Sequence, residues 1–291
     1  MFYEYLKKPI ITSALLLVSF FSLAQAETPD QAASLAINAS VFEQNFANSH
    51  SISATEVRWL TLDSGKFLAL QRHYLSATHR GTAILVADRH STPTNSNGIN
   101  QLRIGLNEHG WDTLALMPPI NVTNVASTDD ATEPETPAAA PTSLSYQQQL
   151  LARLQSAYQV ASLTKMDLIV IAQGSQASYI TKFYLDQVLR LPDAFIVLDA
   201  RPEYWAKQES SDEAPIATSQ ALFSEQISQL DLHILDIYRL QNNLSEHMVL
   251  RKKLSIKNHQ YTYRQSELYD SDNSHQLVKT VYGWLKSAGL N

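Results

Sequence analysis

The chain has 291 residues, a formal net charge of −6 at pH 7 and no cysteine. The lack of cysteine excludes disulfides, thiolate nucleophiles, thiolate metal ligands and a lipid attached through cysteine. Hydrophobic residues make up 44% of the chain, as in an ordinary globular protein. No basic patch stands out, so the acidic balance argues against a nucleic-acid partner.

The first 26 residues predict a signal peptide. Lys7 and Lys8 precede an apolar run at 10–23, and the tripeptide Ala-Gln-Ala at 24–26 follows as a cleavage site. A membrane anchor is the alternative, but a bilayer span requires about 20 apolar residues and this run is shorter. We therefore expect a soluble protein exported to the periplasm, with one domain over 27–291 and no stable membrane span.

Short apolar strands alternate with helical patterns along the chain. Strands are predicted at 57–62, 67–74, 82–87, 111–117, 168–172, 194–198, 232–238 and 261–264. Helices are predicted at 32–46, 99–109, 144–163, 175–191 and 277–285. The turn Asp63-Ser64-Gly65 joins the first two strands as a hairpin. This order predicts an α/β protein with a mostly parallel, doubly wound sheet and an antiparallel entry.

The segment 121–143 consists mainly of Ala, Thr, Pro, Asn and acidic residues, with no basic residue. It has little apolar surface to offset the entropy of ordering the chain. We therefore predict a disordered acidic insertion after the fourth strand, at the rim where a substrate would enter. A surface linker is favoured over a lid.

The most informative segment is 167–177, in which an apolar strand runs into Gly174-Ser175 and then into a helix. This pattern is typical of a nucleophile elbow, G-x-S-x-G, whose nucleophile adopts a strained positive φ. In one register Gly174 takes the tip and no nucleophile is present. In the other, Ser175 takes the tip with Gln173 in a small-residue position. Because Gln173 is too large for that position, we favour Gly174 at the tip.

The element order, this turn and His275 ahead of the last helix resemble the α/β-hydrolase fold, a three-layer sandwich, over almost all of 27–291. Five segments carry a closer resemblance: Arg-Gly-Thr-Ala-Ile-Leu at 80–85, Leu-Arg-Ile-Gly-Leu at 102–106, Gly-Trp-Asp-Thr-Leu at 110–114, Leu-Asp-Ile-Tyr at 235–238 and Gly-Trp-Leu at 283–285. They resemble an uncharacterised exported family of Gram-negative bacteria, a domain of unknown function. That family implies no particular activity.

The fold resemblance implies places for a catalytic triad. Ser175 is the candidate nucleophile, although a serine entering a helix is also a common N-cap. His275 is the candidate base, or a solvated loop residue. The orienting acid is Asp236, which is alternatively a buried structural acid, or Asp199 at the end of the sixth strand. The loop where the acid is usual, at 241–243, holds Gln-Asn-Asn.

The turn after the third strand also departs from the hydrolase pattern. It reads Ala-Asp-Arg-His at 87–90, with no glycine. Backbone oxyanion donors could come from Arg89 or Ser175, but the charge of Asp88 would oppose an oxyanion. Metal-ligand spacings, a P-loop and a dinucleotide fingerprint are not found, so we predict no metal and no cofactor.

Two functions remain. The first is an exported α/β-hydrolase-fold protein with a degenerate catalytic site that binds a small molecule, a glycan or a protein. The alternative is a serine hydrolase of esterase type that uses Ser175 and His275. The departures at the elbow, the acid loop and the oxyanion turn favour the first.

Overall fold

The computed structural model describes residues 41–49, 52–94, 98–120, 145–202, 216–239, 245–268 and 274–290. The predicted signal peptide and the predicted insertion at 121–143 lie outside the described residues. The weak helix expected at 32–46 is described only from residue 41, and residues 41–47 are helical.

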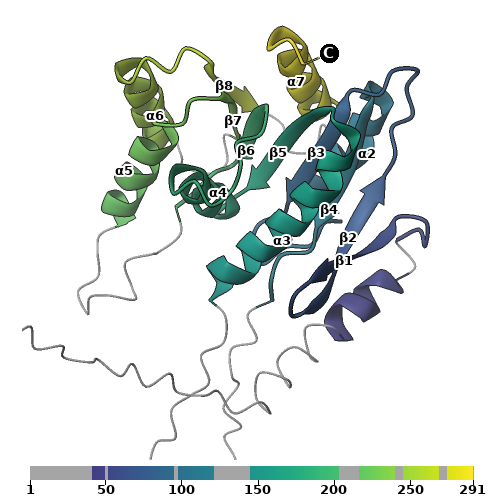
Figure 1. Ribbon diagram of the computed structural model, residues 1–291. Helices are drawn as coiled ribbons and strands as arrows, with labels where there is room; N and C mark the ends of the chain where they lie inside the picture. The colour runs from purple at the N-terminus through teal and green to yellow at the C-terminus, as the bar shows by residue number, and fades with distance from the viewer. Residues whose placement is uncertain are drawn as a thin grey trace, which may run out of the picture.

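The described strands form one eight-stranded sheet in the order β1-β2-β4-β3-β5-β6-β7-β8 (Figure 1). They are β1 (Val57–Leu62), β2 (Gly65–Arg72), β3 (Gly81–Val86), β4 (Trp111–Leu116), β5 (Asp167–Gln173), β6 (Ala194–Leu198), β7 (His233–Arg239) and β8 (Tyr263–Leu268). β2 pairs antiparallel with β1 and β4, and all other pairs are parallel. The predicted mostly parallel sheet with an antiparallel entry is confirmed.

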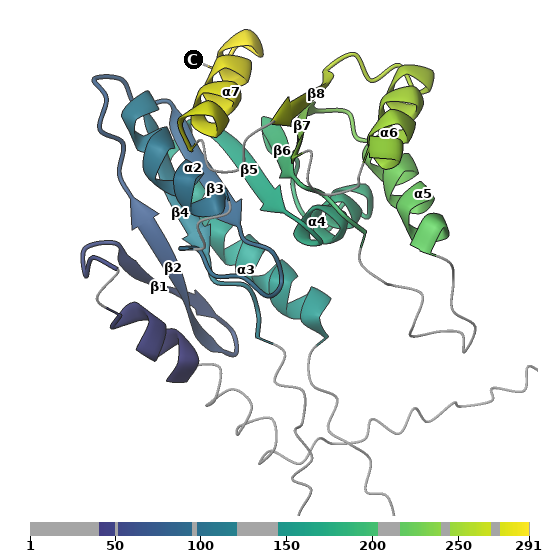
Figure 2. The same ribbon diagram turned by 180° about the vertical axis from the view of Figure 1, so that it is seen from behind.

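Helices cover both faces of the sheet (Figures 1 and 2). One face carries α2 (Ile99–Gly105) and α7 (Ser274–Ser287), and the other carries α3 (Tyr146–Ala161), α4 (Gln176–Leu185), α5 (Ile216–Ile227) and α6 (Ser245–Lys257). The three-layer, doubly wound arrangement follows. All parallel strands therefore end at the same edge of the sheet, and ligands of such folds bind beyond that carboxyl edge.

The central strands divide their side chains between two apolar cores. In β3, Ile84 and Val86 pack on the α3 and α4 side, whereas Ala83 and Leu85 pack on the α2 and α7 side. A strand covered on both faces needs apolar residues at every position, not at alternate ones. The continuous apolar runs therefore predicted the central strands well.

The structure corrects several predicted elements. α5 and α6 were not predicted, α4 ends at Leu185 instead of 191, and β8 covers 263–268 instead of 261–264. α6 escaped detection because its inner face contains the polar residues Arg251 and Ser255, both buried, which hide the helical period. α7 begins at Ser274, so His275 belongs to its first turn and not to a preceding loop.

Candidate functional site

The sharp turn between β5 and α4 has its strained residue at Gly174. Gly174 has φ +60°, whereas Ser175 has the ordinary right-handed values φ −69° and ψ −20°. The Gly174 N–H donates to the Leu198 carbonyl at 2.9 Å, and the Gly174 carbonyl accepts from the Arg201 N–H at 3.1 Å. These bonds fasten the turn to the end of β6. The left-handed conformation that a nucleophile elbow requires at its tip is thus adopted by a residue without a side chain.

The carboxylate of Asp88 lies in the space where a nucleophile's side chain would begin. A Cβ placed on Gly174 would lie 2.4 Å from both Cγ and Oδ1 of Asp88 and 2.6 Å from its Oδ2. Asp88 comes from the turn after β3, the strand that neighbours β5 in the sheet. Glycine is therefore required at 174 both by its backbone conformation and by the carboxylate above it.

Backbone donors converge on one oxygen of this carboxylate. Asp88 Oδ1 accepts from the Arg89 N–H at 2.9 Å, the Ser175 N–H at 3.0 Å and the Ser175 hydroxyl at 2.9 Å. Asp88 Oδ2 pairs with the Arg201 guanidinium. In acyl-transfer sites, the N–H groups after the nucleophile and in the loop following β3 bind the oxyanion. Here the donors at these two places hold a carboxylate oxygen of the protein itself.

Ser175 is buried beside the tip, and its hydroxyl is directed at Asp88. Although it occupies the N-cap position of α4, its side chain makes no capping hydrogen bond. Ser175 is therefore the N-cap residue by position, as in the alternative interpretation, but its hydroxyl does not bond a backbone N–H of the helix. A serine nucleophile needs a base that accepts the proton of its hydroxyl. It also needs oxyanion donors that are free to bind the substrate.

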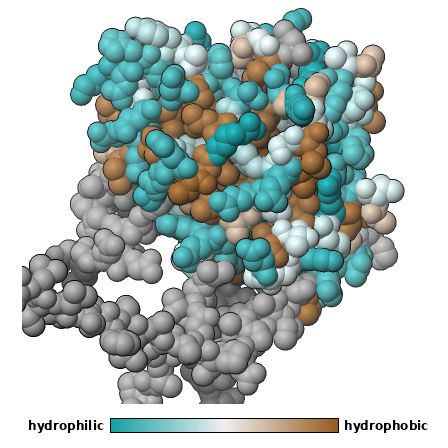
Figure 3. All heavy atoms as spheres, viewed as in Figure 1, coloured by the Kyte–Doolittle hydropathy of each residue, from teal (hydrophilic) through white to brown (hydrophobic). Residues whose placement is uncertain are grey.

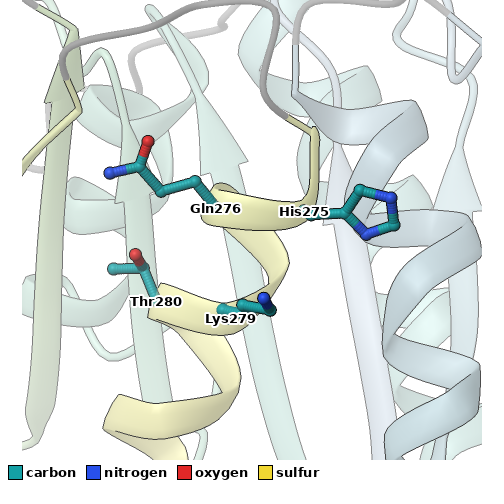
Figure 4. Close-up of a pocket in the computed structure, with 4 residues that line it drawn as sticks. All are labelled: His275, Gln276, Lys279 and Thr280. Carbon is teal, nitrogen blue, oxygen red and sulfur yellow. The ribbon is translucent and has the colours of Figure 1, made fainter.

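His275 lies in the first turn of α7 with an exposed side chain. With Gln276, Lys279 and Thr280 it lines an open pocket of about 420 Å³. Its ring points away from the side of α7 on which Gln276 and Thr280 lie (Figure 4). Within the described part of the chain, the bonded partner of the Ser175 hydroxyl is Asp88 and not His275.

Asp236, the first candidate acid, lies inside β7 and is completely buried. Arg251 Nη1 donates to its two oxygens at 3.0 and 2.8 Å, and the Tyr263 hydroxyl donates to Oδ2 at 2.6 Å. Burial, with the nearby charge of Asp236, raises the pKa of Tyr263, so this hydroxyl remains a donor. These contacts are those of a buried structural acid, which was the alternative interpretation of Asp236.

Asp199, the second candidate acid, follows β6 with a positive φ of 49°. Its carboxylate accepts from the Arg239 N–H at 3.0 Å and from Arg239 Nε at 2.6 Å. Arg239 had not been predicted as a site residue, although its place at the end of β7 was a signal. Ser175, Asp236 and Asp199 therefore each have a different charged partner, and the described contacts join none of them to His275.

A second group of side chains borders the turn and was missed by sequence reasoning. The Arg89 guanidinium lies 4.5 Å from the centre of the Tyr146 ring, and the Tyr146 hydroxyl accepts from the Gln176 amide. Gln176 is buried in the first turn of α4. The signal available was the capping box at the start of α3, where Ser145 Oγ accepts from the Gln148 N–H at 3.3 Å.

The described residues contain no group of three or more His, Cys, Asp or Glu side chains arranged to hold a metal ion. They also contain no helix with the length and apolar character needed to cross a bilayer.

The strand order, the helices on both faces and the turn after β5 define the α/β-hydrolase fold. Est1E from Butyrivibrio proteoclasticus is similar in structure, with a TM-score of 0.56 and 11% identity over 81% of this chain and 100% of that chain. The esterase domain of a Rhodothermus marinus protein has a TM-score of 0.52 and 9% identity, over 79% of this chain and 97% of that chain. A putative dienelactone hydrolase from Klebsiella pneumoniae has a TM-score of 0.51 and 10% identity, over 79% of this chain and 97% of that chain.

At these identities the likeness shows the fold alone. Residues 7–287 match the model of the family described as protein of unknown function DUF3530, and the chain belongs to this family. No curated protein matches the sequence.

Proposed function

We propose that this protein is an exported α/β-hydrolase-fold protein that lacks acyl-transfer chemistry and acts by binding. The observation that carries the proposal is the Asp88 carboxylate beside Gly174, which fills the place of a nucleophile's side chain. The same carboxylate accepts both backbone N–H groups that would bind an oxyanion. A substrate carbonyl therefore meets a negative charge where catalysis requires positive potential.

The ligand we propose is a small molecule, a glycan or a protein that approaches the carboxyl edge of the sheet. Folds of this kind bind ligands beyond that edge, whatever their chemistry. Arg201 is the exposed member of the cluster: its side chain is 56% exposed, against 16% for Asp88. This support concerns the position of the site and leaves the class of ligand open.

The competing function is an esterase-type serine hydrolase that uses Ser175 and His275. The nearness of the Ser175 hydroxyl to the tip favours it. It requires Ser175 to exchange Asp88 for a base, and it requires Asp88 to leave the Arg89 and Ser175 N–H groups. The second change would also take the Asp88 carboxylate away from the Arg201 guanidinium that it pairs with.

A fluorophosphonate probe separates the two functions, because it reacts covalently with activated serines. We expect no labelling of the wild type beyond that of Ser175→Ala, and no hydrolysis of short p-nitrophenyl esters above the level of Ser175→Ala. Ser162→Ala is the matched control, since Ser162 is an exposed serine whose hydroxyl donates to the Gln159 carbonyl. Labelling that Ser175→Ala and His275→Ala abolish, and that Ser162→Ala retains, would establish the hydrolase and sink our proposal.

A further inference from the structure

The outer face of α6 combines exposed apolar side chains with lysines. Val249 is 60% exposed and Ile256 is 68% exposed. They are separated by two helical turns and so lie along one line of the helix. Lys252, Lys253 and Lys257 are also exposed. By helical periodicity, Lys252 lies on one side of that line and the other two lysines lie on the opposite side.

The inner face of α6 attaches the helix firmly to the sheet. Met248, Arg251 and Ser255 are buried. Arg251 binds the buried Asp236 of β7, and its Nη2 also donates to the Ala200 carbonyl at 3.1 Å. The outer face is therefore presented in a fixed orientation and is not needed for the core.

Positive charge is concentrated in this part of an acidic protein. Residues 247–264 contain no Asp or Glu, in a chain whose net charge is −6. They contain five Lys or Arg, of which only Arg251 is buried and paired with Asp236. Among the described residues, no ion pair joins Lys252, Lys253 or Lys257 to an acid. Tyr261, in the turn after α6, is 77% exposed. Hydrophobic and hydrophilic residues adjoin each other at the corner of the molecule formed by α5 and α6 (Figure 3).

We propose that this face of α6 docks on an anionic lipid bilayer, with the helix lying parallel to the membrane surface. Apolar side chains flanked by lysines are typical of interfacial helices, which insert the apolar groups between headgroups. The lysine stems can cover apolar surface while their ammonium groups reach lipid phosphates. Tyr261 would lie at headgroup level, where aromatic residues are enriched.

Vesicle sedimentation tests the proposal, with protein purified from cells that express the whole chain. We expect binding to vesicles with anionic phosphatidylglycerol, little binding to pure phosphatidylcholine, and release in about 0.5 M salt. Lys252→Glu/Lys253→Glu/Lys257→Glu should reduce binding by at least about 100-fold, since each lysine near an anionic surface contributes about fivefold. Val249→Ser/Ile256→Ser should reduce binding with the charge unchanged.

The matched control is Lys66→Glu/Lys165→Glu/Lys286→Glu, which makes the same charge change at exposed lysines elsewhere in the chain. This control should lose far less binding than the α6 variant. Equal loss in the two triple variants, or no preference of the wild type for anionic vesicles, would overturn the proposal. The lipid and salt comparisons use the wild type alone, so a lack of preference for anionic vesicles overturns the proposal even if a variant misfolds. Binding through a retained leader would be the same in all variants.

Discussion

At the scale of single residues, the site is organised around one carboxylate. Asp88 accepts two backbone N–H groups and one hydroxyl, and it pairs with Arg201. The contributions of these partners differ because their exposure differs. A buried donor left without an acceptor costs its full desolvation energy, whereas an exposed ion pair is screened by water. We therefore expect the backbone contacts of Asp88 to dominate its effect on stability.

Asp88→Ala should lower the free energy of unfolding by about 2–3 kcal/mol, because it leaves the N–H groups of Arg89 and Ser175 without their acceptor. Arg201→Ala should cost less than about 1 kcal/mol, because its guanidinium is mostly exposed. Urea denaturation of the two variants and the wild type measures both values. A larger loss for Arg201→Ala than for Asp88→Ala would show that the ion pair, and not the backbone contacts, holds the carboxylate.

At the scale of elements, the helical segment at 41–47 is attached to the domain by a buried ion pair. Glu43 is buried, and its Oε1 lies 2.7 Å from Nη2 of Arg153 on α3. Its other oxygen accepts from the Leu68 N–H of β2 at 2.6 Å. Arg153 also donates to the Met117 carbonyl at the end of β4. One residue from the start of the described chain thus connects to a helix and to the sheet.

Glu43→Ala should destabilise the protein by about 3–5 kcal/mol, because it leaves the buried Arg153 charge without its partner. Val41→Ala, in the same helical segment, should cost less than about 1 kcal/mol, since Val41 is exposed. Chemical denaturation followed by circular dichroism compares the two. A similar decrease in the free energy of unfolding for both variants would contradict a stabilising role of the buried Glu43–Arg153 ion pair.

A second contact between elements should respond to pH. The His109 ring stacks on Tyr282 of α7 at a centroid distance of 4.0 Å, and burial lowers the pKa of His109 below its ordinary value of 6.5. A lowered pKa favours the neutral ring in the folded state. Its contribution to stability is therefore present above pH 6.5 and is lost as the pH falls through the folded-state pKa.

As the pH falls from about 7 to about 5, we expect the free energy of unfolding to decrease less in His109→Gln than in the wild type, because the variant lacks this titrating ring. His73→Gln is the control at an exposed histidine. Unfolding free energies measured across this range give the two slopes. If the slope of the unfolding free energy against pH is the same in His109→Gln as in the wild type, His109 has the same pKa in the folded and unfolded states, which would contradict the prediction.

At the scale of the whole molecule, the export prediction concerns residues outside the described ones. Processing after Ala26 should give a mature chain that begins at Glu27, because the short apolar run and the small residues at 24–26 are typical of a cleaved leader. Intact mass and N-terminal sequencing of protein from the periplasmic fraction check this. Ala26→Arg should block processing, and a wild-type protein that retains Met1 would contradict the prediction.

The sheet could be predicted from sequence because burial on both faces imposes a simple rule on every central strand. Ala83 to Val86 and Leu168 to Ala172 are apolar at each position. Their short length and their Ile and Val residues favour a buried strand over a buried helix. Helices packed on one side obey a weaker rule. α6 replaces apolar residues on its inner face with Arg251, whose charge is balanced by Asp236 on another element. A single-sequence pattern cannot show that pairing.

The candidate site was predictable in position but not in its contacts. The turn after β5, the lack of a nucleophile at Gly174 and the unfavourable charge of Asp88 all followed from residue types. The direction of the Asp88 carboxylate did not, because it depends on how β3 and β5 lie side by side. The ion pairs of Arg201 and Arg239 could not be predicted either, since each arginine pairs with an acid at the end of a different strand.

The coupling free energy between Gly174 and Asp88 tests the central claim most directly. Gly174→Ala should be costly in the wild type, because its Cβ would meet the carboxylate and because alanine disfavours a positive φ. In an Asp88→Ala background only the cost of the positive φ remains, so we predict that the same substitution costs about 1–3 kcal/mol less there. Costs that agree within about 0.5 kcal/mol in the two backgrounds would show that Asp88 does not occupy the nucleophile's place.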